Sequence, residues 1–378
     1  LSVRAAGDLT PARVLGAVQS GRAVAVETAA TGPFRVRLRR TEVLAKGATF
    51  TQTDAAGRSR PVRRERFVTL EGRVEGDPEG SARLTVAAGW VAGVVHAKGR
   101  WYSVEPDDWA NPRRVVVRPA GIEAGAGPWA ALLERDAAAV DEQIPQVGAG
   151  LLNCSLAPCD RLRALIVLDA DAFFRRISPS TCQARQVAVF NGMIGIYKRA
   201  ETRIDLSSPR VNCRTAADLG PPGTSIAVYL ERLRAAWNDE PVDRSAVQLS
   251  AGYSFPAGDP AGYAYLGGIC ARMTPSTAGP VHLSQRCSNG YSVYQAVRRP
   301  GTSYSASVYL RTKLAAHELG HNFNADHDPG SLCRSRQPLT GPIMCALLQD
   351  RGPNRFSAPS AETIRRHAEQ NLGSITGT

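Results

Sequence analysis

Three histidines lie within eleven residues in the last quarter of this chain, and their spacing limits how that segment folds. His317 and His321 are four residues apart, so on a helix both imidazoles face the same side, one turn above the other. His327 follows six residues after His321, too far along a straight helix to reach the same point. The helix must therefore end soon after His321, and the chain must turn back for the three rings to meet.

Two further residues fit that geometry. Asn324 lies between His321 and His327, and asparagine is, after glycine, the residue that best tolerates the left-handed conformation of a sharp helix end. Asp328 follows His327 directly, and we expect its carboxylate to hydrogen-bond the turn or a histidine ring. The pattern thus predicts a helix, a turn at Asn324 and a third histidine that returns to the first two.

Three neutral imidazoles and a water complete a four-coordinate zinc ion, the arrangement of catalytic rather than structural zinc sites. Bound zinc lowers the pKa of its water towards about 7 and polarises a carbonyl group. Glu318, next to the first histidine, is placed to take the proton and deliver it to a leaving amine. We therefore expect one catalytic zinc ion and hydrolysis of amide bonds. No calcium-binding loop is recognisable, so a Ca2+ ion has no support.

The eight cysteines all follow residue 153. Their even number and the lack of a C-x-x-C pair favour disulfides over a zinc ribbon, with the pairing left open. Disulfides form in oxidising compartments, so we expect a secreted, extracellular or periplasmic protein. Residues 1–30 show no signal-peptide pattern, which fits a leader that was removed or omitted.

The net charge of +12 is spread along the chain, without a block of like charges. No basic stripe with interleaved aromatic residues occurs, so a nucleic-acid partner is not expected. No apolar run approaches the roughly 18 residues of a membrane span, so a membrane partner is not expected either. A preference for acidic substrates is compatible with this charge.

The length of 378 residues suggests two domains. Apolar and polar residues alternate in several segments of the cysteine-free half, which predicts a small antiparallel sandwich or barrel with strands at 34–40, 67–74, 82–86, 90–96 and 100–105. Residues 119–153 are rich in Ala, Gly and Pro and are interpreted as a linker with one short helix near 128–140.

Strand and helix patterns are mixed in the second half. We expect strands at 161–169, 246–250, 263–269 and 291–297, and helices at 181–200 and 225–237. The predicted fold class is therefore α+β. The predicted domains are a β-rich region at 1–118, the linker at 119–153, and a catalytic region at 154–378.

The histidine segment resembles the long motif of the metzincin zinc endopeptidases, H-E-x-x-H-x-x-G-x-x-H followed by a Met-turn. Gly341-Pro-Ile-Met344-Cys, 17 residues after His327, is similar to that Met-turn. The resemblance implies a mixed twisted sheet, an active-site helix, and Met344 beneath the zinc as a hydrophobic floor.

Within the metzincins, the chain is most similar to the adamalysin/reprolysin group, whose motif also ends in His-Asp. Tyr263-Ala-Tyr-Leu-Gly-Gly-Ile-Cys resembles that group's edge strand above the cleft, which binds substrate as an added strand. The resemblance implies that Ala264, Tyr265, Leu266 and Gly267 contact the substrate; the competing interpretation is an ordinary strand.

The first half resembles the propeptide of the same group at residues 72–77 and 102–106. The resemblance implies a zymogen whose N-terminal prodomain acts as an intramolecular inhibitor. Residues 1–153 lack the cysteine that often blocks zinc in that group. Cys154 or Cys159 can take that role, although pairing in a disulfide is the simpler interpretation.

Asn324 stands where adamalysins have glycine, and His-x-x-Asn-x-x-His-Asp is similar to the peptidyl-Asp metalloendopeptidases of the Asp-N type. This resemblance implies cleavage on the amino side of aspartate. The pocket for that aspartate needs a cation, and Arg351 and Arg355 follow the Met-turn that walls it in metzincins. Surface arginines are the competing interpretation.

Two other functions stay open. One is a catalytically silent, zinc-containing binding protein on the same fold; the other, less favoured, is a basic nucleic-acid binder. The three remaining histidines, His96, His282 and His367, are expected at the surface rather than on a metal.

Overall fold

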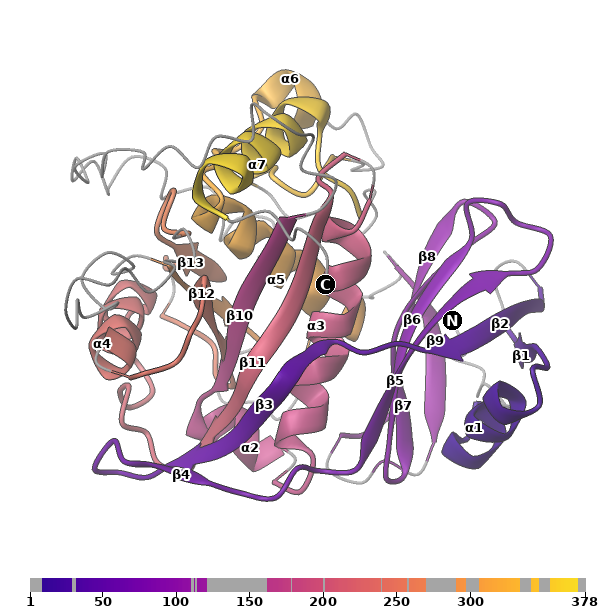
Figure 1. Ribbon diagram of the computed structural model, residues 1–378, viewed down its shortest axis with the longest axis horizontal. Coiled ribbons are helices and arrows are strands. Elements are labelled where there is room, and N and C mark those ends of the chain that lie inside the picture. Colours follow the sequence, from indigo (N-terminus) through magenta and orange to yellow (C-terminus); the bar gives the residue numbers. More distant parts are fainter. Residues whose placement is uncertain are drawn as a thin grey trace.

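A computed structural model describes residues 9–28, 32–109, 112, 114–120, 162–177, 179–199, 201–238, 240–256, 258–269, 290–296, 306–333, 341–346 and 354–372. Two seven-stranded sheets are present, and the helices α3 (Cys182–Tyr197) and α5 (Val308–Asn322) pack between them. Figure 1 shows this layered arrangement, with the N-terminal sheet on one side and the mixed sheet on the other. The fold is α+β, as predicted.

The N-terminal sheet is antiparallel throughout and follows the order β1-β2-β5-β6-β7-β8-β9. Helix α1 (Pro11–Gln19) packs on one face and shares an apolar core with it. The other face packs against α3 and α5. The strands are β1 (Val24–Val26), β2 (Phe34–Arg40), β5 (Phe67–Val74), β6 (Ser81–Ala87), β7 (Trp90–Ala97), β8 (Arg100–Pro106) and β9 (Val115–Pro119).

The second sheet follows the order β13-β14-β12-β10-β11-β3-β4 and is mostly parallel. Its outermost strands, β13 and β4, run antiparallel to their neighbours. Burial on both faces explains the continuous apolar runs of its central strands. The strands are β3 (Leu44–Thr53), β4 (Ser59–Pro61), β10 (Leu162–Ala170), β11 (Ile204–Arg214), β12 (Ala246–Ala251), β13 (Gly262–Ala264) and β14 (Tyr291–Gln295).

Four more helices surround this sheet: α2 (Ala172–Ile177), α4 (Ile226–Asn238), α6 (Gly330–Cys333) and α7 (Ala358–Asn371). Helix α4 packs on the sheet face opposite α3, with an apolar core of its own. Among the described residues, two disulfides tie the region together, Cys182–Cys213 and Cys333–Cys345. No helix among the described residues is long and apolar enough to cross a membrane.

Strand β3 joins the two halves of the chain. It leaves the N-terminal sheet and lies parallel to β11, so that residues from the first 61 positions complete the second sheet (Figure 1). The alternation of apolar and polar residues is broken at Lys46 and Gly47, which is why the sequence did not predict this strand. The domain boundaries at 118 and 154 stay a prediction.

Two expectations about local structure were wrong. The N-terminal strands form one sheet between helices instead of a sandwich or barrel, because α1 covers one face and α3 and α5 cover the other. The strand expected at 263–269 spans only Gly262–Ala264, because the following residues bond the active-site helix instead. The short helix expected at 128–140, and His282, lie outside the described residues.

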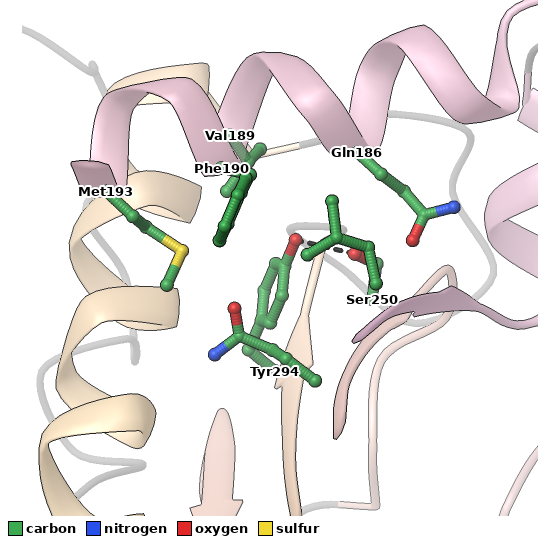
Figure 2. A pocket seen from close by; sticks show the side chains of 8 residues that line it. Gln186, Val189, Phe190, Met193, Ser250 and Tyr294 are labelled. Carbon is green, nitrogen blue, oxygen red and sulfur yellow. Dashed lines mark hydrogen bonds between the residues drawn. The ribbon is translucent and has the colours of Figure 1, made fainter. Parts of the chain in front are cut away.

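A narrow recess lies between α3 and strands β10, β12 and β14 (Figure 2). Gln186, Gln248, Ser250 and Tyr294 give it a polar lining, and the Ser250 and Tyr294 hydroxyls bond one another. Four apolar side chains complete the lining, and the recess has no room for a water molecule, so it is a packed part of the core and not a ligand pocket.

Candidate active site

The helix α5 presents the first two histidines. Its N-cap is Ser307, whose hydroxyl accepts a hydrogen bond from the Leu310 N–H. The helix is buried nearly all round, which fixes its rotation. His317 and His321 therefore lie one above the other, and their ring centroids are 4.7 Å apart.

The imidazole nitrogens converge on one point. The Nε2 atom of His317 is 3.0 Å from that of His321 and 3.3 Å from that of His327. A tetrahedral zinc ion with bonds of about 2.0–2.1 Å to imidazole separates two such nitrogens by about 3.3 Å. The three side chains therefore fit a zinc ion.

Backbone carbonyls orient two of the three rings. The His317 Nδ1–H donates to the Ile343 carbonyl at 2.7 Å, and the His321 Nδ1–H donates to the Ala325 carbonyl at 2.8 Å. Each bond leaves the Nε2 lone pair free for a metal. The rings are held in the tautomer and the orientation that coordination needs.

The turn after α5 brings the third histidine back. Asn324 has a φ of 65°, the left-handed conformation that the sequence predicts for it. The N–H groups of Asn324 and Ala325 donate to the His321 and Gly320 carbonyls and close the helix end. The turn also places the Ala325 carbonyl against the His321 ring.

Met344 lies in the loop that supports the histidines from below. It is fully buried, and a Cβ atom on Gly320 would lie 2.6 Å from its sulfur, so the glycine leaves room for the methionine. The neighbouring Ile343 carbonyl holds His317, while the Met344 carbonyl accepts from the Asp328 N–H at 2.8 Å. The loop therefore connects to both ends of the histidine motif.

The Asp328 carboxylate does not bond a histidine or the turn, in contrast to the expectation. It accepts hydrogen bonds from the hydroxyls of Ser357 and Ser360 at the start of α7. The serines are better placed because the Ser357 side chain also caps α7. Asp328 anchors α7 to the site. Its neighbours Cys333 and Cys345 do not form a second metal site with it, since their sulfurs are joined.

Glu318 is 2% exposed and lies beside the edge strand β13. A Cβ atom on Gly262 would lie 2.0 Å from the Glu318 Oε1, so a larger residue there would displace the Glu318 carboxylate. Burial raises the pKa of Glu318 well above its ordinary value. Gly262 was not identified from the sequence, because a single glycine carries no signal of what packs against it.

The sequence model of metallo-peptidase family M12 matches residues 161–363, more than half of the chain and the whole of this site. The protein belongs to metallo-peptidase family M12. It is therefore a metallopeptidase, and its substrates are proteins or peptides. A search among curated proteins finds no match.

Comparison with solved structures supports the fold of this M12 metallopeptidase. The crystal structure of metalloproteinase-II from Bacteroides fragilis aligns with a TM-score of 0.53 and 8% identity, over 94% of this chain and 95% of that one. A chaperone–substrate complex aligns with a TM-score of 0.38 and 13% identity, over 56% of this chain and 35% of that one, too low to carry an argument. At 8% identity, the similarity to metalloproteinase-II shows a shared fold and nothing more.

The edge strand of the M12 metallopeptidase exposes fewer backbone N–H and carbonyl groups to a substrate than the sequence predicts. The N–H groups of Tyr265 and Gly267 donate to the Tyr291 and His321 carbonyls, and the Tyr265 carbonyl accepts from the Asn322 amide. These backbone groups are therefore not free for a substrate, and the Tyr265 side chain is buried. Of the four expected substrate contacts, Leu266 exposes 46% of its surface.

Among the described residues, no strand pairs with the outer edge of β13. Ala261 and Tyr265 bond β14, and the residues that face a partner strand alternate along an antiparallel ladder. The N–H and carbonyl groups of Gly262 and Ala264 therefore point away from β14. Ala264 keeps its expected position at this edge, and Gly262 joins it.

Of the two expected arginines, Arg351 lies outside the described residues. Arg355 is exposed, and its carbonyl accepts from the Ile343 N–H at 3.0 Å. A second cation that the sequence did not indicate, Arg199, lies close to it. Burial lowers the pKa of Arg199, Glu201 opposes that shift, and the charge of Arg355 adds to it.

The other described histidines stay apart from the metal ligands. The His96 ring lies 4.8 Å from the Trp101 ring, and His367 hydrogen-bonds Asn371 within α7. Both residues are half-buried rather than exposed, and the expectation that they do not bind a metal stays a prediction.

Proposed function

We propose that this M12 metallopeptidase is a zinc-dependent endopeptidase, in which His317, His321 and His327 hold the ion and Glu318 is the general base. The convergence of three oriented Nε2 atoms beside a buried carboxylate carries the proposal. When bound, the zinc ion polarises the scissile carbonyl and acidifies a water.

Residues of the chain bind the substrate strand, transfer the proton and orient the histidines. A substrate strand that pairs with Gly262 and Ala264 runs past Glu318, since the carboxylate lies against Gly262. Glu318 takes one proton from the attacking water as the C–O bond forms. It then gives that proton to the amine nitrogen as the C–N bond breaks. The Ile343 and Ala325 carbonyls fix the orientation of the His317 and His321 rings, and Met344 packs beneath them.

Variation of one carboxylate tests this function. Purified protein should cleave peptides, lose activity with a chelator and regain it with zinc. Glu318→Gln should retain one zinc per chain by elemental analysis and lose activity by about 10²–10⁴-fold. Retained activity in that variant would refute the role of Glu318. Zinc binding with a persistent lack of cleavage, also after removal of the N-terminal region, would favour the silent binding protein.

Cleavage on the amino side of aspartate is a second part of the proposal. The support is Asn324 in the motif and Arg355, whose backbone carbonyl bonds the N–H of Ile343, the residue whose carbonyl holds His317. A guanidinium suits a carboxylate side chain. Peptides from a mixed protein digest, identified by mass spectrometry, should begin with Asp; a flat profile contradicts the preference. Arg355→Ala should reduce the bias, and Arg366→Ala, exposed on α7, should not.

Secretion and latency are also proposed. The disulfides Cys182–Cys213 and Cys333–Cys345 support an oxidising compartment. Inhibition by the N-terminal prodomain stays a prediction: removal of residues 1–118 by proteolysis should raise peptidase activity if they block the cleft. Unchanged activity on release would contradict it.

A further inference from the structure

The segment 58–66, called here the basic segment, carries five arginines in nine residues. It contains β4, the outermost strand of the second sheet, and continues to β5 of the N-terminal sheet. Figure 1 shows this stretch of chain along the lower edge of the molecule, while α6 and α7 lie at the upper edge. The basic segment therefore lies at the end of the molecule opposite α6 and α7.

The arginines of the basic segment are exposed, and most of them lack a carboxylate partner. Arg58 is the exception, since its guanidinium group pairs with the Asp54 carboxylate at 3.1 Å. In the part of the chain that the structure describes, the side chains of Arg60, Arg63 and Arg66 make no hydrogen bond or ion pair. Three guanidinium groups are therefore free to bind an anion.

Glu65, the only carboxylate within the basic segment, binds backbone groups instead of these arginines. It accepts hydrogen bonds from the N–H groups of Gln183 and Ala184, at 3.2 and 2.8 Å. Burial raises the pKa of Glu65 to about 7, so part of the population carries no charge at this position at neutral pH. The positive charge of the basic segment is therefore poorly compensated.

Hydrogen bonds fix the backbone of the basic segment to the body of the protein. The Val62 N–H donates to the Phe50 carbonyl at 2.9 Å. The Gln183 side chain donates its amide N–H to the Arg63 carbonyl at 3.3 Å, and its oxygen accepts from the Glu65 N–H at 2.9 Å. The arginines thus project from an ordered backbone, which lowers the conformational entropy that is lost on binding.

Helix α2 adds positive charge from a distant part of the sequence. Its last turn holds Arg175 and Arg176. Burial raises the pKa of Glu65, and the charges of Arg185 and Arg175 oppose that rise, so α2 lies close to the basic segment. Arg176 is exposed, and its guanidinium group lies 4.9 Å from the Phe173 ring. Arginines more than a hundred positions apart thus meet in one basic surface.

Protection of a sheet edge explains only part of this surface. Within the described ranges, no strand pairs with the outer edge of β4, and charged residues and proline at such an edge discourage pairing with another chain. Arg60 and Pro61 belong to β4 and fit that role. Arg63, Arg66 and Arg176 lie outside β4, so edge protection does not account for them.

The side chains around the basic surface favour one class of polyanion. A guanidinium group binds a sulfate or phosphate group through two parallel N–H bonds. The rings of Phe50 and Phe67, which lie 5.7 and 4.6 Å from the Arg64 guanidinium group, are buried and offer no platform on which nucleic-acid bases can stack. An acidic polysaccharide needs no such platform, because charge and hydrogen bonds suffice to bind it.

We propose that Arg60, Arg63, Arg66 and Arg176 form a binding surface for a sulfated or phosphorylated polysaccharide. The three arginines of the basic segment span about 20 Å when the chain is extended, so one polymer can contact all of them. Pairing with the sulfate or phosphate groups releases counterions, so binding weakens as the salt concentration rises. The proposal concerns binding at this surface alone, so it stands or falls independently of zinc and of peptidase activity.

Removal of charge from the full chain, with a matched control, tests the surface. The test variant combines Arg60→Ser, Arg63→Ser and Arg66→Ser. The control removes the same charge from exposed β2 arginines that pair with carboxylates: Arg35→Ser, Arg37→Ser and Arg39→Ser. For binding to dextran sulfate, the slope of log affinity against log salt concentration should shrink by about 2–3 in the test variant and by less than about 1 in the control.

Other polymers decide the class of partner. Uncharged dextran should not bind, and a comparison of dextran sulfate with dextran phosphate shows which ester is preferred. No binding of the unmodified protein to either ester, or equal loss of affinity in the test and control variants, would overturn the proposal. Tighter binding to a DNA duplex than to both esters would replace the polysaccharide by a nucleic acid.

A measurement on the unmodified protein covers variants that fail to fold. Phenylglyoxal modifies accessible arginines, and mass spectrometry locates the modified positions. Dextran sulfate should slow the modification of Arg60, Arg63, Arg66 and Arg176, and should leave the rate at Arg35 unchanged. Equal protection at Arg35 and at the basic surface, or no protection at all, would contradict a binding surface at this place.

Discussion

At the scale of single residues, two small side chains decide the geometry of the site. Asn324 takes a left-handed backbone conformation so that His327 can return to the other two ligands. Gly262 leaves the space in which the Glu318 carboxylate lies. Neither residue touches a metal, yet each determines where a chemically active group lies.

Substitution at position 324 separates backbone strain from side-chain chemistry. Asn324→Ala should lower the free energy of unfolding by about 1–2 kcal/mol, because alanine is strained at this φ. Asn324→Gly should retain nearly the full free energy of unfolding, since glycine adopts this conformation readily. Urea unfolding of the three proteins checks this, and equal loss in both variants would show that the amide side chain matters instead.

Gly262→Ala should displace the Glu318 carboxylate without removing a metal ligand. We expect kcat/KM to fall by about 10²-fold, as for a displacement of roughly 1 Å at a catalytic group. Zinc content should be unchanged. Gly16→Ala on α1 is the control, because a Cβ atom there meets nothing within 4 Å. Full activity in Gly262→Ala would show that Glu318 has room to move.

At the scale of elements, the site is a junction of four segments. Helix α5 supplies two histidines, the turn after it supplies the third, the Met344 loop orients the rings, and α7 is attached through Asp328. The Cys333–Cys345 disulfide closes the segment between the last histidine and Met344. The ligands are thus held by contacts between elements rather than by one rigid helix.

Asp328→Ala should loosen α7 and the loop above it. Two serine hydroxyls lose a charged acceptor, and we expect a loss of about 1–3 kcal/mol in the free energy of unfolding. Glu362→Ala on the exposed face of α7 removes surface ion pairs with Arg365 and Arg366 and should lower the free energy of unfolding much less. Urea unfolding compares the two; equal losses would refute an anchoring role for Asp328.

At the scale of the whole molecule, stability should depend on pH through Glu65. Burial raises its pKa from 4.5 to about 7 in the folded protein. A carboxyl group with a raised folded-state pKa stabilises fully below its unfolded pKa, and this contribution is lost as the pH rises through the folded value. From this group, the free energy of unfolding should therefore fall between about pH 4.5 and 7.

The test is the difference between the unmodified protein and Glu65→Gln. Urea unfolding across pH 4.5–8 should show a flatter profile in the variant, because glutamine does not titrate. Other carboxyl groups affect both proteins equally and cancel in the difference. Parallel profiles would show that Glu65 keeps an ordinary pKa.

Prediction from the sequence succeeded where one local pattern decides the structure. Strand β2 follows the alternation of apolar and polar residues, and the spacing of His317, His321 and Asn324 required a helix and a turn. It failed where a distant partner decides. β3 lacks alternation and is held by its pairing with β11 and β4, and the strand expected at 263–269 is cut short because Gly267 and Ile269 donate to carbonyls at the end of α5.

The sequence by itself determined the cluster of three histidines, the neighbouring carboxylate and the turn residue, since these depend on spacings within eleven residues and on the conformational tolerance of asparagine. Only the tertiary structure decided that Gly262 lies against Glu318, that Asp328 holds α7, and that Glu65 and Glu105 cap helices more than a hundred residues away. The physical reason is that buried polar groups must find partners wherever the chain brings them, and those partners leave no local pattern in the sequence.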